Sequence, residues 1–123
     1  MLVLLDTSIL IFLVERPSTF LDELGGKMGN VEISVPDSVI GELKGLAGSR
    51  GVKAKKARLA LSYAAGLRCL KHGGEADDAL VSLAQENGAL VATLDRKLMS
   101  SLRRRGVLVA TVKGDRLLLP GTG

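Results

Sequence analysis

Two aliphatic segments that each run into an aspartate constrain the fold of this chain most strongly. Residues 2–6 read LVLLD, and residues 89–93 read ALVAT and are followed by Leu94 and Asp95. A short, continuous aliphatic run is typical of a strand that is buried on both faces of a parallel sheet. Burial of an unpaired, ionised carboxylate is costly. We therefore expect Asp6 to lie at a strand end, where water, a hydrogen-bond donor or a positive charge meets it.

Strands and helices alternate along the rest of the chain. Further strands are predicted at residues 31–35, 67–71, 107–112 and 116–119, the last at a sheet edge. The spacing of apolar residues predicts helices from Thr7 onward, from Pro17 and Ser18 to the glycines at 25, 26 and 29, and over residues 37–47, 52–66, 75–88 and 94–106. This alternation predicts a three-layer α/β domain with a mainly parallel sheet.

The chain length and composition predict one domain with an aliphatic core. The 123 residues include two phenylalanines, one tyrosine and no tryptophan, so leucine, valine, isoleucine and alanine must fill the core. We expect the domain to span residues 1–119 and residues 120–123 to form a loose tail. Polar residues are candidate side-chain caps for two helices: Thr7 or Ser8 for the first, and Asp37 or Ser38 for the third.

The motifs that the sequence lacks argue against several classes of protein. Its single cysteine, Cys69, excludes an internal disulfide and a cysteine-rich zinc site, and fits a reducing cytoplasm. No basic residue precedes the first apolar run, which Asp6 interrupts, so we expect no signal peptide; no uncharged stretch has the length of a membrane span. No P-loop, GxSxG or Cys–His pattern points to nucleotide hydrolysis or acyl transfer.

Charge is arranged in alternating blocks along the chain, with a net charge of +4. Residues 41–71 contain eight bases and one acid, residues 72–95 contain five acids and no base, and residues 96–123 contain seven bases and one acid. An acidic site with basic surface around it would fit an anionic polymer that is processed at a cation centre. Solvated helix faces explain the basic blocks equally well. Because aromatic residues are few, nucleic acid would be recognised through its backbone and shape.

Five acids are candidates for one site. Ligand sites of open α/β sheets form beyond the carboxyl ends of the strands, and Asp6 and Asp95 follow two such ends. The other three lie on predicted helices: Glu42 beside an apolar stripe, and Asp77 and Asp78 in a first turn. Each also has a purely structural explanation: helix capping for Asp6 and Asp95, the helix dipole for Asp77 and Asp78, and a stripe edge for Glu42.

Gathered carboxylates would raise one another's pKa values, and a divalent cation would remove that conflict. Oxygen ligands favour a hard ion such as Mg²⁺ or Mn²⁺, and Mg²⁺ accepts only one or two carboxylates directly and keeps several waters. Such an ion can activate a water and stabilise charge on a phosphoryl oxygen. The acids therefore point to metal-assisted phosphodiester chemistry.

Four segments, LLDTSILI, VPDSVIGELKGL, ADDALVSLA and VATLDRKL, resemble in order and spacing the motifs of PIN-domain ribonucleases. The resemblance covers nearly the whole chain. It implies an α/β/α fold and Mg²⁺- or Mn²⁺-dependent endonucleolytic cleavage of RNA. It gives catalytic roles to Asp6, Glu42, Asp78 and Asp95. Metal ligation falls to Asp6, Asp78 and Asp95, with Asp77 competing with Asp78, and support of the site falls to Ser8 and Thr93.

The last two motifs look most like the branch that matures small-subunit ribosomal RNA and its archaeal relatives. A VapC-type toxin that an antitoxin blocks remains an alternative, as does a non-catalytic RNA-binding factor of ribosome assembly; a receiver-like signalling domain fits poorly, because the middle of the chain is a basic helix. Family members often dimerise. Candidate RNA contacts are Lys53, Lys55, Lys56, Arg58, Arg96, Arg103, Arg104 and Arg105.

Overall fold

The computed structural model describes residues 1–15, 19–114 and 116–120. Its strands are β1 (Leu2–Leu5), β2 (Glu32–Pro36), β3 (Arg68–Leu70), β4 (Leu90–Ala92), β5 (Leu108–Lys113) and β6 (Arg116–Leu118). Its helices are α1 (Thr7–Glu15), α2 (Phe20–Met28), α3 (Asp37–Ala47), α4 (Val52–Ala64), α5 (Ala76–Asn87) and α6 (Arg96–Arg104). Strand bounds lie within one or two residues of those predicted from the sequence.

The strands form one six-stranded sheet in the order β3-β2-β1-β4-β5-β6. All pairs are parallel except β5 and β6, which are antiparallel. The central strand β1 pairs Leu4 with Ser34 of β2 on one side and with Val91 of β4 on the other. This topology explains why β1 and β4 are aliphatic throughout: each has a strand on both sides and helices above and below.

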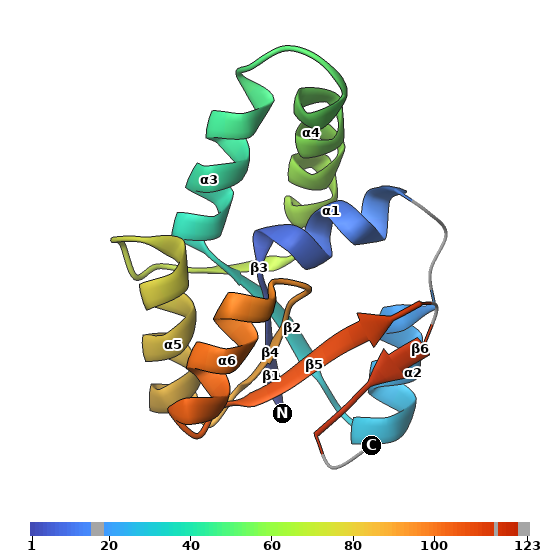
Figure 1. Cartoon of the computed structure of the whole chain (residues 1–123), viewed down its shortest axis with the longest axis vertical. Coiled ribbons are helices and arrows are strands. Elements are labelled where there is room, and N and C mark those ends of the chain that lie inside the picture. Colours follow the sequence, from blue (N-terminus) through green and yellow to red (C-terminus); the bar gives the residue numbers. More distant parts are fainter. Residues whose placement is uncertain (16–18, 115, 121–123) are drawn as a thin grey trace.

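Helices cover both faces of the sheet, which confirms the predicted three-layer α/β/α fold. Figure 1 shows α5 and α6 on one side of the sheet and α2 on the other, against β6. Helices α3 and α4 pack against each other as a hairpin that projects beyond the sheet, and α1 packs against both. The core between the layers is aliphatic; among the described residues Phe20 is the one buried aromatic side chain.

Helix capping by Asp6 and Asp95, given above as their structural explanation, is confirmed, whereas the other expected caps are wrong. Asp6, rather than Thr7 or Ser8, caps α1, because the backbone N–H of Ile9 donates to its Oδ1 at 3.0 Å. The cap position of α3 is Pro36, without a side-chain hydrogen bond, so neither Asp37 nor Ser38 caps that helix.

Two further expectations concern the ends of elements. Helix α2 runs through the glycines at 25 and 26 and ends at Met28; its C-cap is Gly29, where φ is +78° and favours glycine. The expected turn at Pro17 and Ser18 lies outside the described residues, as does most of the expected tail.

The carboxyl ends of the parallel strands meet at one edge of the sheet. Residues that directly follow β1, β2, β3 and β4 therefore lie near one another, although they come from distant parts of the sequence. None of the helices in the described ranges is long and apolar enough to cross a membrane.

Candidate active site at the carboxyl edge of the sheet

Asp6 follows β1 and lies at the centre of a hydrogen-bond network. The residue is 6% exposed. Oδ1 accepts from the hydroxyl of Ser8 at 2.7 Å and from the backbone N–H of Ile9 at 3.0 Å. Oδ2 accepts from the hydroxyl of Thr93. Three donors therefore fix the orientation of a carboxylate that burial would otherwise leave without partners.

The hydroxyls of Ser8 and Thr93 connect the end of β1 to the segment after β4. Each hydroxyl donates its hydrogen to the Asp6 carboxylate, and its oxygen accepts a hydrogen bond from a backbone N–H. Ser8 Oγ accepts from the N–H of Leu94 at 2.9 Å, and Thr93 Oγ1 accepts from the N–H of Asp95 at 3.0 Å. The two residues predicted to support the site thus hold Asp6 and the start of the β4–α6 connection together.

The pKa of the Asp6 carboxyl is raised by some of its surroundings and lowered by others. Burial raises the pKa of the Asp6 carboxyl, the three hydrogen bonds lower it, and the negative charge of Asp95 raises it further; the net direction is upward. The ionised form is less stable than it would be in water, because desolvation penalises the charge more than the donors stabilise it. A nearby cation would reverse this balance.

Asp95 is a helix cap as well as a candidate ligand. It is the N-cap residue of α6, and its Oδ1 accepts from the backbone N–H groups of Lys97 at 2.9 Å and Leu98 at 3.1 Å. Its Oδ2 has no hydrogen-bond or ion-pair partner among the described residues. The cap therefore fixes the side chain and leaves one oxygen of this exposed carboxylate available to a ligand.

Asp77 is electrostatically linked to acids on other elements as well as on its own helix. Its pKa is raised by desolvation first, then by Asp95, Glu42 and its neighbours Glu75 and Asp78. Asp77 lies in the first turn of α5, and Glu42 lies on α3, which packs against α5. Both side chains are exposed, as is that of Asp78. The candidate acids of α3, α5 and the β4–α6 connection therefore share one electrostatic environment.

The chemistry of these donors fits a divalent cation that keeps much of its water. All donors are carboxylate or hydroxyl oxygens, which hard cations prefer. In the part of the chain that the structure describes, no three acidic, histidine or cysteine side chains lie close enough to hold one ion together. Direct ligation by one or two carboxylates, with water bridging to the rest, is the usual mode of Mg²⁺.

Asp37 contributes to the site in a way that the sequence did not indicate. It follows β2, and its Oδ1 accepts from the backbone N–H groups of His72 and Gly73, each at 3.1 Å. These bonds lower the pKa of the Asp37 carboxyl. Gly73 has φ +78° and Gly74 has φ +73°, so the turn they form before α5 needs glycine. Asp37 therefore anchors the loop that leads into Asp77.

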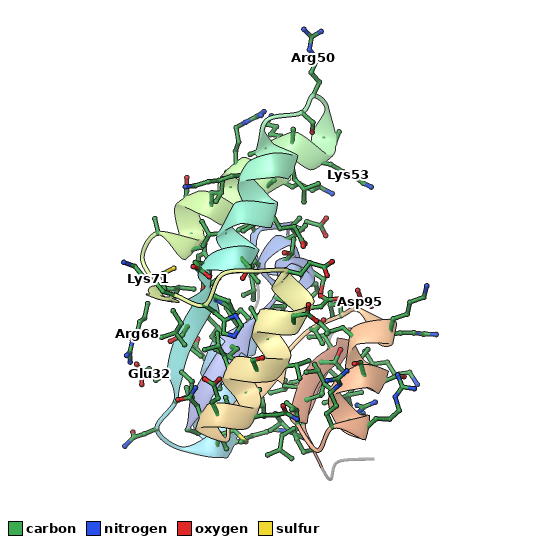
Figure 2. The ribbon with its side chains drawn as sticks, turned by 90° about the vertical axis from the view of Figure 1, so that its left-hand side faces the viewer. Glu32, Arg50, Lys53, Arg68, Lys71 and Asp95 are labelled. Carbon is green, nitrogen blue, oxygen red and sulfur yellow. The ribbon has the colours of Figure 1, made fainter. Side chains whose placement is uncertain are left out.

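The eight predicted RNA contacts fall into two groups. On α4, Lys56 forms an ion pair with Glu15 at 2.7 Å, and Arg58 donates to the backbone oxygen of Ala47 at 2.9 Å. Lys53 and Lys55 are exposed without a partner among the described residues, as are the bases of α6 and its C-cap, namely Arg96, Arg103, Arg104 and Arg105. Figure 2 shows Lys53 near the tip of the α3–α4 hairpin and Asp95 lower, at the start of α6.

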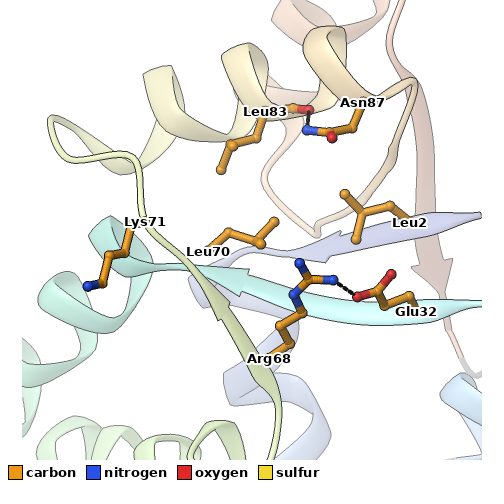
Figure 3. Close-up of a pocket in the computed structure, with 7 residues that line it drawn as sticks. All are labelled: Leu2, Glu32, Arg68, Leu70, Lys71, Leu83 and Asn87. Carbon is orange, nitrogen blue, oxygen red and sulfur yellow. Dashed lines mark hydrogen bonds and ion pairs between the residues drawn. The ribbon is translucent and has the colours of Figure 1, made fainter.

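A separate hollow of about 350 Å³ lies at the β3 edge of the sheet. Leu2, Leu70 and Leu83 form apolar parts of its lining, and Glu32 and Arg68, which form an ion pair, line it as well (Figure 3). None of the candidate acids lines it. This hollow is therefore distinct from the electrostatically linked acids Asp6, Glu42, Asp77 and Asp95, which we call the acid cluster.

Comparison with known proteins identifies the family of this chain. A family model described as PIN like domain matches residues 3–115. No curated protein gives a significant match to the sequence.

Solved structures share the fold. The PIN domain endonuclease Utp24 superposes with a TM-score of 0.74 and 24% identity, over 97% of this chain and 90% of its own. A domain of a functionally unknown protein from Methanocaldococcus jannaschii gives 0.70 and 16%, over 94% and 93%. VapBC2 from Rickettsia felis, bound to a DNA fragment from its promoter, gives 0.69 and 15%, over 92% and 100%.

Proposed function

Because this chain belongs to the PIN like domain family, we propose that it is an Mg²⁺- or Mn²⁺-dependent endoribonuclease whose site is the acid cluster at the carboxyl edge of the sheet. The observation that carries the proposal is the electrostatic link between acids on separate elements: Asp95 raises the pKa of both Asp6 and Asp77, and Glu42 raises that of Asp77. Uncompensated repulsion of this kind destabilises a fold, whereas a bound divalent cation turns it into binding energy.

Asp6 and Asp95 are the proposed ligands that hold the cation, directly or through water. When bound, the cation supplies electrostatic stabilisation of the negative charge that develops on the phosphodiester. Asp6 is held in place by Ser8, Thr93 and the start of α1. Asp95 is held by its cap bonds and offers Oδ2. Glu42, exposed on α3, is proposed to orient the attacking water.

The third acid of the cluster is proposed to be Asp77 in preference to Asp78. The resemblance favours Asp78, which directly precedes the apolar residues of α5. In the folded chain, however, the pKa of Asp77 responds to both Asp95 and Glu42. Adjacent helical residues point about 100° apart, so we expect one of the two to be directed more closely toward the other acids. Loss of cation binding in Asp77→Asn, with binding retained in Asp78→Asn, is the expected result.

The proposed biological role is processing of small-subunit ribosomal RNA. It follows from the resemblance of the last two motifs and accords with the fold shared with the endonuclease Utp24. A toxin that pairs with an antitoxin is the alternative role for the same activity, since the VapBC2 complex shares the fold as well. Growth arrest on expression of the active protein, absent for Asp6→Asn, favours the toxin.

Cleavage of labelled RNA in the presence of Mn²⁺ tests the activity. We expect endonucleolytic fragments with 5′-phosphate ends, no cleavage in EDTA and none by Asp6→Asn. Asp22→Asn, which removes one exposed acid from α2, is the matched control and should cleave normally. If the wild-type protein binds RNA but cleaves none of the tested RNAs, the chain is a non-catalytic RNA-binding factor and the proposal is wrong.

A further inference from the structure

Helix α6 carries a one-sided basic face. Leu98 and Leu102 are buried against the domain, and α6 packs on β5. The exposed side carries Arg96 and Lys97 in the first turn and Arg103 and Arg104 in the last, with no acidic residue between them. Residues seven or eight positions apart return to the same side of a helix. The four cations therefore form two pairs along one face, which we call the α6 strip.

The α6 strip begins at the acid cluster. Asp95 is the N-cap of α6, so Arg96 and Lys97 directly adjoin a proposed cation ligand. The helix has nine residues, which at a rise of about 1.5 Å per residue places its far end roughly 13 Å from Asp95. A stacked strand advances roughly 3.4 Å per nucleotide, so this length corresponds to about four nucleotides.

A hollow of about 400 Å³ lies where the α6 strip ends. It is lined by the last turn of α5 and by the segment after α6, including Gln85, Gly88, Arg105 and Leu108. Gln85 donates its Nε2 to the backbone oxygen of Arg105 at 3.3 Å, which leaves its Oε1 as an acceptor. The Arg105 side chain has no hydrogen-bond or ion-pair partner in the described part of the chain. The hollow thus offers a planar cation and an amide oxygen.

We propose that a single RNA strand leaves the acid cluster along the α6 strip and places one base, about four nucleotides from the scissile phosphate, in the hollow lined by Gln85 and Arg105. The proposal rests on the proposed function, because it takes the acid cluster as the cleavage site. The strip neutralises phosphates without reading sequence. A guanidinium plane stacks on a base, and the Gln85 oxygen accepts from a base amino or imino group.

The occupant is RNA rather than an acidic protein because of the spacing and continuity of the surface. The paired cations follow a line that starts at the acid cluster and ends at a pocket with stacking and hydrogen-bonding groups. A polyanion with regularly spaced phosphates and planar bases matches all three features. An acidic peptide matches the cations alone.

Binding in EDTA tests the strip without any cleavage. The probe is a fluorescent oligouridylate of roughly twelve nucleotides, a length within the range of single-strand sites, followed by anisotropy as salt is varied. Arg103→Ala/Arg104→Ala should weaken binding on the order of tenfold and reduce the salt slope by about 1.4, at roughly 0.7 for each phosphate that is no longer neutralised. Lys27→Ala/Lys113→Ala removes the same charge from exposed positions on α2 and β5 and should change binding less than about threefold, by the same reasoning. Equal weakening of RNA binding by both double variants would contradict the proposal that RNA binds along the α6 strip.

An oligonucleotide of the same length without bases tests the hollow. The wild-type protein should bind the oligouridylate on the order of tenfold more tightly than the abasic strand, within the range of base stacking energies. Arg105→Ala and Gln85→Ala should each reduce this preference, and neither should change affinity for the abasic strand by more than its charge accounts for. If both variants keep the wild-type preference, no base occupies the hollow.

These outcomes are separable from those that test the proposed function. The strip and the hollow are measured by binding in EDTA, where the acid cluster has no cation. If the protein cleaves RNA while both α6 tests fail, it is a ribonuclease whose RNA leaves the acid cluster by another path. All the side chains substituted in these binding variants are exposed, and thermal melting verifies that each variant is folded.

Discussion

Two aspartates follow neighbouring parallel strands, Asp6 after β1 and Asp37 after β2. Their surroundings shift the pKa values of the two carboxyl groups in opposite directions. Both accept backbone N–H groups at the same edge of the sheet. Asp6 is buried in the acid cluster, and its pKa is raised by desolvation and by Asp95. Asp37 is half-exposed beside a glycine turn, and the N–H groups of Gly73 and His72 lower its pKa. Burial and like charge, rather than hydrogen bonding, separate the two.

The difference shows how a functional carboxylate can be told from a structural one. The charge of Asp37 is stabilised by partners that the chain itself supplies, so it needs nothing more. The charge of Asp6 is incompletely compensated by the described residues, which supports our proposal that it binds an external cation. We therefore expect removal of these two charges to have opposite effects on stability and unequal effects on activity.

The largest expected effect is on cleavage. Asp6→Asn should lower kcat/KM for RNA cleavage with Mn²⁺ by at least about 100-fold, because even indirect ligand partners cost roughly 10- to 100-fold. Asp37→Asn should lower it by less than about tenfold, since this residue anchors a loop and is not a proposed ligand. Initial rates over a range of RNA concentrations measure both. Equal losses in the two variants would show that the β1 end has no special role.

Cation binding gives the next largest effect. In thermal melts, Mn²⁺ at about 100 times its Kd should stabilise the wild-type protein by roughly 2.7 kcal/mol. Asp37→Asn should retain this increase and Asp6→Asn should lose most of it, because the proposed cation site lies at the end of β1 and not at the end of β2. An unchanged response of Asp6→Asn to Mn²⁺ would place the cation elsewhere.

Two buried hydroxyl groups, those of Thr93 and Ser34, should differ in their contribution to stability. Thr93 is fully buried and donates to Asp6, so Thr93→Val should lower the free energy of unfolding by about 1–3 kcal/mol. Ser34 on β2 is equally buried, but its hydroxyl has no hydrogen-bond partner among the described residues. Ser34→Ala should therefore be neutral or stabilising. Chemical denaturation measures both, and a decrease as large in Ser34→Ala would point to packing as the cause.

The sequence predicted the sheet well because buried parallel strands have a recognisable local sequence pattern. A strand buried on both faces must be aliphatic along its length, as β1 and β4 are. Asp6 and Asp95 follow those two strands in the sequence. Because the strands run in the same direction, both residues were expected at the same end of the sheet. Local patterns were sufficient wherever the physical cause lies within a few residues.

Partners that are distant in the chain left no such pattern. The resemblance, and no local pattern, pointed to Thr93, which lies 87 residues from Asp6, and nothing pointed to Gly73, which lies 36 residues from Asp37. The pattern around Asp37 resembled a helix cap, while its acceptor capacity was used by a turn elsewhere. The choice between Asp77 and Asp78 depends on the rotation of α5, which the packing of its buried residues determines. Sequence spacing alone does not give that rotation.

The smallest expected effect is on the pH dependence of stability. Asp37 and Asp6 should change it with opposite signs. In EDTA at pH 7, Asp37→Asn should melt below the wild-type protein, because a carboxyl whose pKa is lowered in the folded state stabilises that state above its ordinary value of 3.8. The difference should vanish as the pH falls through the folded pKa of Asp37. Thermal melts of both proteins from acid to neutral pH measure this trend.

Asp6 should show the opposite sign in the same melts. Its raised pKa makes the wild-type protein lose stability as the pH rises from 3.8 through the folded pKa, because the buried carboxyl is then forced to ionise. Asp6→Asn, which carries no charge at either pH, should therefore melt above the wild-type protein at pH 7 and approach it at acid pH. A shift of the same sign in both variants would mean that the burial of Asp6 is compensated within the chain, and the end of β1 would then need no cation.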